Sequence, residues 1–458
     1  MRQVSLVELH LANISNMTNR LTDLRLFKSI LAGFLSFTVV LLILFNVNAI
    51  ISPSGSYPAS LKTIQSVSST ISTTVELPLA TERCRQLPGA DDVLVIVKTG
   101  ATALRERLPV HFKTTLQCIQ HYVVFSDMEE EFEGHYIHDV LSGVSAEMKK
   151  SAPEFKFYRD LHENRDRVTE FMGENAAVQR NAWNLDKWKF LPVVERALQA
   201  KPDAKWFMFI EADTFLVWSN LLKWLAKLDW REPYFLGQPV TMAGQLFAYG
   251  GSGWLLSRPA IQRMTYHMAS QNGDYEYFTN KTSFGDLILG YVLEQAGLGL
   301  TGAWPVIQRE TPSTMEYTKD IWCYPVVTFH HIDALDIKSI WNLEQEWIAD
   351  VQTPLLHFDI FNHLIYPLLA TKIDDWDNFS NGEEKVLAPN EGFEDCKLHC
   401  EEDVQCMQFR FTPKKCTMSH SITLGWKADR SINSISGWMM ERIAQVKASV
   451  RCEEEKWI

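Results

Sequence analysis

Residues 29–51 form a run of 23 residues without a single charged side chain. At about 1.5 Å of helical rise per residue, the run spans roughly 35 Å, enough to cross the hydrocarbon core of a bilayer. Arg20, Arg25 and Lys28 precede it, whereas the next basic residue after it is Lys62. Because positive charge stays on the cytoplasmic side, residues 1–28 are expected in the cytoplasm and everything after residue 51 in the lumen. The sequence therefore predicts a single-pass type II signal anchor, with a buried core helix as the alternative interpretation.

The flanks of this run favour an anchor over a cleaved signal peptide. A signal peptide has a shorter apolar region nearer the first methionine and a small-residue cleavage site, and neither is evident here. After the span, residues 52–81 are rich in serine and threonine, contain Pro53, Pro58 and Pro78, and carry few large apolar side chains. Such a segment has little to offset the entropy of ordering it, so we expect an extended lumenal stem.

The cysteines agree with this topology, because all eight follow the span. They are Cys84, Cys118, Cys323, Cys396, Cys400, Cys406, Cys416 and Cys452. An even number of cysteines in an oxidising compartment indicates disulfides. Two N-glycosylation sequons, at Asn280 and Asn378, also lie on the expected lumenal side. Those at Asn13 and Asn16 are expected to stay unmodified in the cytoplasm.

The overall charge excludes one class of partner. Hydrophobic residues make up 46% of the chain and charged residues 22%, as in globular proteins that bury a full core. The 44 basic and 56 acidic residues give a formal charge of −12. Nucleic-acid binding requires a basic surface, so nucleic acid is not expected as a partner.

The body after the stem is predicted to be an α/β unit with a parallel sheet. Short apolar runs typical of buried strands occupy residues 92–97, 122–125 and 206–210, and a helical stretch through Cys118 separates the first two. Strand, helix and strand in this order imply a right-handed crossover between parallel strands. Polar residues follow all three runs, namely Lys98, Thr99, Asp127, Glu211 and Asp213. Ligands of open α/β sheets bind at the carboxyl ends of the strands, although strand ends are commonly polar in any case.

Glu211 and Asp213 are the chemical centre of this prediction. Two carboxylates separated by one residue at a strand end can face the same way and hold a hard divalent cation, Mg²⁺ or Mn²⁺. Such a cation can bridge the phosphates of a nucleotide diphosphate and neutralise charge as the diphosphate leaves. The pattern is weak by itself and gains its value from the apolar strand before it.

Four ordered segments together resemble a known family. Residues 205–217 resemble the strand and acidic motif of the fringe-like, core-1-type, inverting β-1,3-glycosyltransferases of family 31. Residues 247–257 resemble that family's glycine-rich acceptor-side segment, residues 284–290 its acidic segment, and residues 325–331 its terminal histidine segment. The resemblance covers roughly residues 84–347. It implies a GT-A-like, Rossmann-type sheet flanked by helices, and a UDP-sugar as donor substrate.

The resemblance also implies the metal site and the base. Asp213 matches the metal-binding carboxylate, Glu211 begins the acidic motif, and His330 matches a histidine that completes the site; His331 is the alternative. Imidazole suits Mn²⁺ better than Mg²⁺, so manganese is the expected cofactor, although a histidine pair beside a strand is often only structural. Asp286 matches the general base, and a helix start would favour its ionised form. A helix N-cap is the alternative role for Asp286.

The remaining expected site residues follow from the same resemblance. Relatives hold uracil and ribose at the positions of Lys98, Thr99 and Asp127, and either Lys187 or Lys189 brings a lysine to the donor. On the acceptor side are Tyr249, Gly250, Gly251 and Trp254. The glycines permit close approach of a ligand or simply form a tight turn, and the aromatic residues stack on a sugar or belong to the core.

The acidic motif departs from the family, where it is mostly aspartate. Here it is Glu211, Ala212 and Asp213, so one oxygen ligand is lost while the last aspartate is kept. We therefore expect an active type II Golgi enzyme that transfers a hexose or N-acetylhexosamine from a UDP-sugar to a hydroxyl of a glycan or glycoprotein. A non-catalytic Golgi lectin or chaperone-like relative is the alternative.

A small cysteine-rich module is expected at residues 385–452, after a glycosyltransferase domain at 82–375 and a polar linker. Its cysteine spacing resembles a PAN/apple module, a type that binds proteins or carbohydrates. That resemblance implies the pairs Cys396–Cys416 and Cys400–Cys406, with a zinc site as the rival interpretation. Cys84 and Cys118 bracket the first strand and helix and are expected to pair. The partners of Cys323 and Cys452 stay open.

Overall fold

The computed structural model describes residues 82–165, 176–271 and 274–458. The predicted cytoplasmic tail, membrane span and stem, and the sequons at Asn13 and Asn16, lie outside these residues. In the part of the chain that is described, no helix combines the length and apolar character needed to cross a bilayer. The described residues belong to one compact unit.

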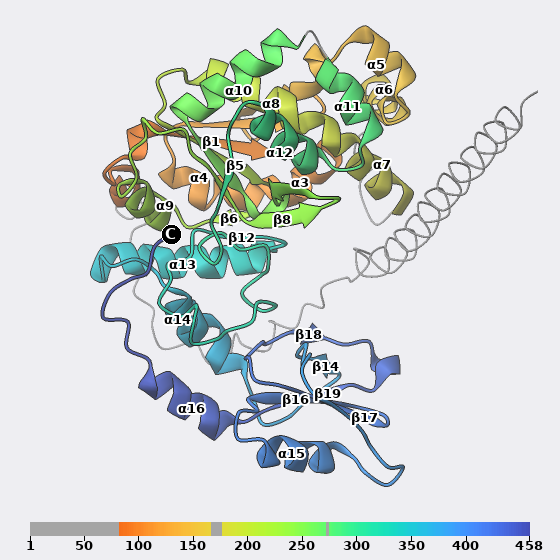
Figure 1. The fold of residues 1–458 in the computed structure, drawn as a ribbon, viewed down its shortest axis with the longest axis vertical. Helices are drawn as coiled ribbons and strands as arrows, with labels where there is room; N and C mark the ends of the chain where they lie inside the picture. Colours follow the sequence, from red (N-terminus) through yellow and green to blue (C-terminus); the bar gives the residue numbers. More distant parts are fainter. Residues whose placement is uncertain (1–81, 166–175, 272–273) are drawn as a thin grey trace, which may run out of the picture. The chain divides into compact units, whose positions relative to one another are not determined.

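An eight-stranded sheet forms the centre of the fold (Figure 1). Its order is β11-β7-β10-β5-β1-β2-β4-β3. The strands are β1 Val93–Lys98, β2 Tyr122–Ser126, β3 Glu130–Phe132, β4 His135–Asp139, β5 Trp206–Glu211, β7 Phe235–Gly237, β10 Trp254–Ser257 and β11 Leu300–Gly302. The three strands predicted from sequence are β5, β1 and β2, and they are neighbours and parallel, as expected. The outer part is mixed, because β10 runs antiparallel to both β5 and β7, and β3 runs antiparallel to β4.

Helices cover both faces of this sheet, and the alternation of side chains along β1 shows why. All six residues of β1 are buried. Leu94 and Ile96 pack into one core with α6, α8, α10 and α12, whereas Val93, Val95 and Val97 pack into the other with α3 and α9. The helices are α3 Ala101–Phe112, α4 Thr115–Cys118, α5 Ala146–Ser151, α6 Phe155–Glu163, α7 Ala176–Asp186, α8 Phe190–Ala200, α9 Trp218–Leu225, α10 Arg258–Ser270, α11 Asp274–Lys281, α12 Gly285–Gln295 and α13 Ala334–Asp350.

The C-terminal residues build a second, antiparallel sheet of five strands, covered by helix α15 (Phe393–Glu402). Its order is β13-β19-β16-β17-β15, with strands β13 Ile373–Asp374, β15 Glu384–Val386, β16 Gln408–Thr412, β17 Lys415–Ser419 and β19 Ile435–Trp438. The sheet therefore takes in residues from both sides of the boundary expected between 375 and 385. We call residues 373–452 the C-terminal module.

All eight cysteines form disulfides. The pairs Cys84–Cys118, Cys396–Cys416 and Cys400–Cys406 confirm the expectation and leave no thiol for a zinc site. The pair left open by the sequence is Cys323–Cys452, with Cα atoms 5.3 Å apart. It ties the end of the C-terminal module to the loop that precedes β12 (Thr328–Phe329).

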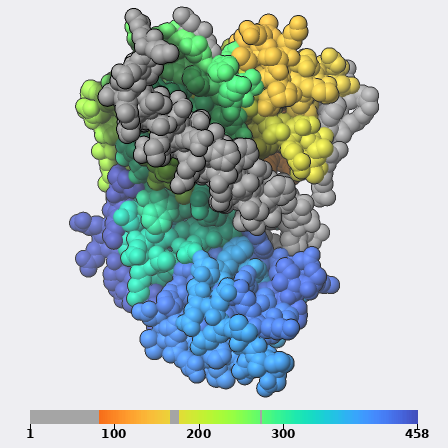
Figure 2. Space-filling view, turned by 45° about the vertical axis from the view of Figure 1, so that its right-hand side comes forward, coloured from red at the N-terminus to blue at the C-terminus, as the bar shows by residue number. Residues whose placement is uncertain are grey.

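The C-terminal module shares a hydrophobic core with the preceding domain. Ile422, Trp438 and Ile443 belong to the same buried cluster as Phe215 and Phe329. An isolated backbone bridge also joins Tyr317 to Ile422. In the space-filling view, the blue surface of the module continues directly into the teal surface of the segment before it (Figure 2). The module is therefore packed against its neighbour rather than joined only by a linker.

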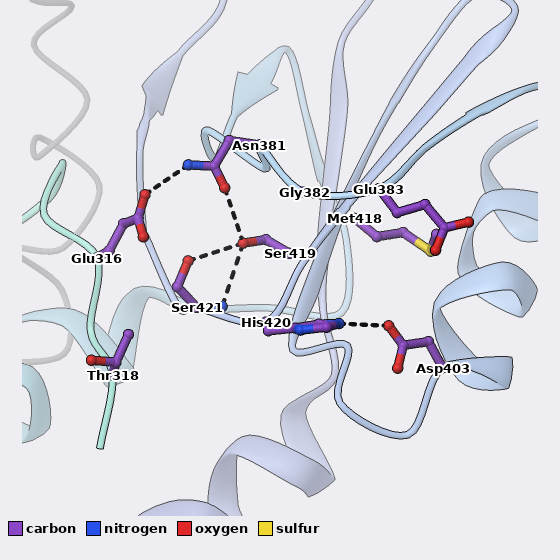
Figure 3. Close-up of a pocket in the computed structure, with 10 residues that line it drawn as sticks. All are labelled: Glu316, Thr318, Asn381, Gly382, Glu383, Asp403, Met418, Ser419, His420 and Ser421. Carbon is purple, nitrogen blue, oxygen red and sulfur yellow. Dashed lines mark hydrogen bonds and ion pairs between the residues drawn. The ribbon is translucent and has the colours of Figure 1, made fainter. Parts of the chain in front are cut away.

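A cavity of about 430 Å³ lies at this boundary (Figure 3). Glu316 and Thr318, from the segment before the C-terminal module, line one side of it. The C-terminal module contributes residues 381–383, Asp403 and residues 418–421. Asn381 donates to the Glu316 carboxylate at 2.7 Å, and His420 contacts Asp403 at 2.7 Å. None of these residues belongs to the predicted donor, metal or acceptor sites.

The sequon at Asn378 lies in the segment expected to be a polar linker, and that expectation is wrong. Asn378 is 0% exposed because it sits between strands of the C-terminal module. Its side-chain amide donates to the Phe409 carbonyl at 3.1 Å, and its amide oxygen accepts from the Ser380 hydroxyl at 2.8 Å. The buried amide nitrogen of Asn378 leaves no room for a glycan in the folded protein, whereas Asn280 on α11 is partly exposed.

We predict that the protein secreted or retained in the secretory pathway carries a glycan on Asn280 and none on Asn378. Glycopeptide mass spectrometry of the folded wild-type protein measures both sites directly. Asn280→Gln, the matched variant at the partly exposed sequon, should remove the glycan-dependent shift in mobility. A glycan found on Asn378 in folded protein contradicts this prediction.

Candidate metal and donor site

A short antiparallel pairing brings the acidic motif and the histidine segment together. Strand β6 (Phe215–Leu216) pairs with β12, with Phe215 opposite Phe329. One step further along, the Ile332 amide donates to the Asp213 carbonyl at 3.1 Å. The residues between, His330 and His331, are thus placed beside Asp213. The predicted meeting of Asp213 and His330 is confirmed.

Three side chains converge at this point. His330 Nε2 lies 3.5 Å from Asp213 Oδ1, and His331 Nδ1 lies 3.9 Å from Asp213 Oδ2. One ligand atom from each of the three residues lies within 4.8 Å of the others. His331, the alternative from sequence, therefore joins His330 rather than replacing it. His331 adopts a left-handed backbone conformation, with φ of 56°, that non-glycine residues use rarely.

The donor set fits a divalent cation. His330 is 4% exposed, so its ring is enclosed, and its Nε2 faces the Asp213 carboxylate at 3.5 Å while its Nδ1 has no hydrogen-bond partner. Burial and the neighbouring His330 lower the pKa of His331 to about 4, so its ring is neutral at neutral pH and offers a lone pair. One carboxylate and two imidazoles form a set that suits Mn²⁺ and other transition metals better than Mg²⁺.

The glycine-rich segment holds the His330 ring in place. Thr214 Oγ1 donates to the Gly251 carbonyl at 2.6 Å, and Thr328 Oγ1 donates to the Ser252 carbonyl at 2.7 Å. A Cβ atom on Gly251 would lie 2.3 Å from His330 Nε2, so only glycine leaves room for the ring. Gly250 is similarly constrained, because a Cβ there would lie 2.7 Å from the Phe190 ring. Both glycines therefore allow another side chain of the protein, the His330 ring or the Phe190 ring, to pack against the backbone.

Helix α3 supplies two residues that the sequence did not single out. Arg107 contacts Asp213 Oδ2 through its guanidinium. One turn later, His111 Nε2 lies 2.8 Å from the Ala212 carbonyl. Burial alone would raise the pKa of Asp213, but His330 and Arg107 outweigh it and hold that pKa well below its usual range. The only sequence signal for this pair is the spacing of four residues on one helix face.

Asp186 joins the expected donor residues into one chain of largely buried ion pairs. Lys98 Nζ lies 2.5 Å from Asp186 Oδ2 and 3.0 Å from Glu211 Oε1. Lys189 Nζ lies 3.3 Å from Asp186 Oδ1 and 2.8 Å from Asp127 Oδ2. Burial works against the charge of Lys98, but Asp186 and Glu211 outweigh it and raise its pKa. Asp186, which links the two lysines, was missed by sequence reasoning.

The structure distinguishes between the two candidate lysines. Lys189 also donates to the Thr99 carbonyl at 2.7 Å, so it belongs to the same cluster as Lys98 and Thr99. Lys187 instead contacts Glu154 at 2.9 Å and the Thr282 carbonyl at 2.9 Å, away from that cluster. The buried Asp127 accepts from the Ala101 amide at 2.8 Å and so closes the start of α3. Thr99 Oγ1 is buried without a partner.

Asp286 lies in the first turn of α12 but does not cap it, because the N-cap residue is Phe284. Its Oδ2 accepts from the Gly250 amide at 3.0 Å and its Oδ1 from the Leu287 amide at 2.9 Å. Burial nevertheless raises the pKa of Asp286 to about 6. The expectation that the helix start favours the ionised form is therefore wrong. Desolvation raises the pKa of Asp286 by more than the two hydrogen bonds lower it.

The two expected aromatic residues have different surroundings. Tyr249 packs edge-on against His330, with ring centroids 5.6 Å apart. Burial raises the pKa of Tyr249, and the nearby carboxylates of Glu211, Asp286 and Asp213 add to the effect, so Tyr249 lies within electrostatic reach of all three. Trp254, in contrast, is 2% exposed and stacks on Phe209 at 3.8 Å. The prediction of Trp254 as an acceptor contact is replaced by its alternative, a core residue.

Comparison with known sequences agrees with this geometry. The sequence model of the Fringe-like family matches residues 89–303, which include β1, the acidic motif, the glycine-rich segment and Asp286. We call residues 89–303 the fringe-like domain, after the family model that they match. The resemblance to fringe-like β-1,3-glycosyltransferases is thereby confirmed. The fringe-like domain ends before His330, His331 and the C-terminal module.

Two curated proteins that the chain resembles carry the same name. The chain is 27% identical over 162 residues to a human beta-1,3-glucosyltransferase. This alignment covers 33% of this chain and 30% of the relative. It is 26% identical over 144 residues to the mouse beta-1,3-glucosyltransferase, which covers 30% of this chain and 27% of the relative. The chain thus spans less than a third of the length of either relative.

We predict that Gly251→Ala weakens Mn²⁺ binding by about tenfold or more, because the new methyl group displaces the His330 ring. Isothermal titration of the purified protein with Mn²⁺ measures the loss. Gly299→Ala is the matched control, since a Cβ there meets no atom within 4 Å. Equal Mn²⁺ affinity in both variants and the wild type would show that the ring position does not matter.

Proposed function

We propose that the protein is a metal-dependent, inverting β-1,3-glycosyltransferase that moves a hexose or N-acetylhexosamine from a UDP-sugar to a hydroxyl of a glycan or glycoprotein. The observation that carries the proposal is the convergence of Asp213, His330 and His331 at the carboxyl end of β5. That end of a parallel strand is where α/β sheets bind nucleotides. The fringe-like domain and the name of its curated relatives support the same reaction class.

The metal site has a defined place in this proposal. Asp213, His330 and His331 would hold the cation, with Mn²⁺ favoured by the two imidazoles. When bound, a divalent cation stabilises the negative charge of the departing diphosphate. Glu211 is not part of this group of converging ligands, and its carboxylate contacts Lys98 at 3.0 Å. The loss of a carboxylate at Ala212 is thus compensated in the proposed site by the second histidine.

Ion pairs connect the residues of the donor end in the absence of any ligand. Lys98, Asp186, Lys189 and Asp127 alternate in charge and hold one another within 3.3 Å. These contacts fix the carboxyl ends of β1 and β2, beside which uracil and ribose are proposed to lie. Thr99 Oγ1, buried without a partner, is the group here with unused hydrogen-bonding capacity. A site fixed in this way loses little entropy when it orients the nucleotide.

Asp286 is proposed as the general base. Each of its oxygens accepts one backbone amide, which fixes the carboxylate while further lone pairs can accept the proton of the acceptor hydroxyl. In the transfer, a bond forms between the acceptor oxygen and the anomeric carbon as the bond from that carbon to the diphosphate oxygen breaks. The proton passes to Asp286, and UDP leaves. A base with a pKa of about 6 is ionised at neutral pH yet basic enough to take that proton.

The proposed location is the Golgi membrane, with the fringe-like domain in the lumen. Four disulfides in the described residues support an oxidising compartment. The uncharged run at 29–51 with basic residues before it supports a type II anchor. The C-terminal module is proposed to be of the PAN/apple type on its cysteine pairing.

The test is UDP release by the purified full-length protein from UDP-glucose, UDP-galactose and the two UDP-N-acetylhexosamines, with and without Mn²⁺. We predict Mn²⁺-dependent turnover of at least one donor, and a fall in kcat of about 10²–10⁴-fold in Asp286→Asn without loss of UDP binding. Because Asp286 must be ionised, wild-type kcat should fall as the pH drops below about 6.

Asp274→Asn is the matched control, since Asp274 also lies in the first turn of a helix but on exposed α11. It should keep wild-type turnover and the wild-type pH profile. Absence of turnover with every donor and a broad acceptor panel, with Mn²⁺ present, would favour the non-catalytic lectin or chaperone. Unchanged kcat in Asp286→Asn would remove Asp286 from the mechanism while leaving the reaction class intact.

A further inference from the structure

Arg107 holds the carboxylate that the proposed metal site needs most. Its guanidinium contacts Asp213 Oδ2, the same oxygen that His331 faces at 3.9 Å. Asp213 is largely buried, with its side chain 13% exposed, whereas that of Arg107 is 45% exposed. One end of this ion pair is therefore fixed within the protein, and the other is a long side chain with access to solvent.

We propose that Arg107 competes with a divalent cation for Asp213 and, once the cation has taken that carboxylate, binds the nucleotide diphosphate. This inference rests on the proposed function of the site. Under this proposal the cation and the nucleotide bind cooperatively. The cation frees Arg107 from Asp213, and the diphosphate gives the freed guanidinium a new partner.

The competition follows from charge and geometry. Arginine stays protonated at any physiological pH, so Arg107 cannot yield Asp213 by losing its proton. A divalent cation bound to Asp213, His330 and His331 would lie beside the guanidinium, and like charges at such distances repel. The cation must therefore displace Arg107 from Oδ2, and the cost of breaking this pair weakens cation binding to the protein alone.

The displaced side chain has few other partners. His111, one turn along α3, holds the helix to the Ala212 carbonyl at 2.8 Å, so the helix stays in place while the side chain moves. Among the described residues, the other carboxylates that act on the Arg107 charge are those of Glu106 and Glu211, and Lys98 already holds Glu211 at 3.0 Å. A diphosphate bound to the cation places new negative charge next to Arg107. The planar guanidinium can bind two phosphate oxygens at once, which a lysine cannot do.

The test measures Mn²⁺ affinity and UDP affinity separately in full-length wild-type protein, Arg107→Gln and Arg107→Lys. Electron paramagnetic resonance counts free Mn²⁺, and calorimetry measures UDP binding at saturating Mn²⁺. We expect Arg107→Gln to bind Mn²⁺ alone about tenfold more tightly, and UDP about tenfold more weakly, than the wild type. Arg107→Lys keeps the charge and loses the fork, so its Mn²⁺ affinity should stay near wild type while UDP binding weakens.

Arg105→Gln is the matched control, because Arg105 lies on the same helix and pairs with Glu130 at 2.6 Å instead. It should leave both affinities unchanged. The inference is overturned if Arg107→Gln binds Mn²⁺ no more tightly than the wild type, or if its UDP binding is unchanged. In that case, binding of both Mn²⁺ and UDP by the wild-type protein would still support the proposed metal site. If wild type and Arg105→Gln bind neither Mn²⁺ nor UDP, the proposed function itself fails, and the role of Arg107 fails with it.

Discussion

The two-residue antiparallel ladder between β6 and β12 is the constraint on which the candidate site depends. It joins chain segments that are more than a hundred residues apart and sets His330 and His331 opposite Asp213. The ladder is extended on one side by the Val217 amide, which donates to the Val327 carbonyl at 2.8 Å. Phe215 and Phe329 are both 0% exposed, so the pairing is held by burial as well as by hydrogen bonds.

That burial connects the site to the C-terminal module. Phe215 and Phe329 share their core with Trp438 and Ile443 of the module. The disulfide Cys323–Cys452 closes the same region covalently, and a cross-link over a long loop limits the freedom of the unfolded chain most. The module thus has a supporting role for the histidine segment, whatever it binds on its own surface. The matched family region, which ends at residue 303, does not include this support.

The sequence was most informative where the signal is local. Apolar runs predicted β1, β2 and β5, because residues buried on both faces of a sheet are apolar throughout. The positions of Asp213, His330 and Asp286 came from resemblance of short motifs, and the structure places Asp213 and His330 together. The cysteine pairs of the module were implied by its resemblance to PAN/apple modules, and the structure contains both pairs.

The sequence failed where an effect depends on distant neighbours. Asp186 and Arg107 were missed because their ion pairs join residues 88 and 106 positions apart. Lys187 and Lys189 are equivalent in sequence, and only the local 3₁₀ turn directs one toward Asp127 and the other toward Glu154. The raised pKa of Asp286 comes from burial, which no local pattern reports. Asn378 was predicted to lie in a linker because a polar residue in a sequence gives no indication that it is buried and hydrogen-bonded.

The central claim is that one divalent cation binds between Asp213, His330 and His331. The most direct measurement is anomalous X-ray diffraction at the manganese edge from crystals of the protein grown with Mn²⁺ and UDP. The account predicts one strong anomalous peak within bonding distance of the Asp213 carboxylate and of at least one of the two imidazoles, with the diphosphate in contact with it. A fully occupied UDP with no anomalous peak there, or with Mn²⁺ bound at another place, would contradict it.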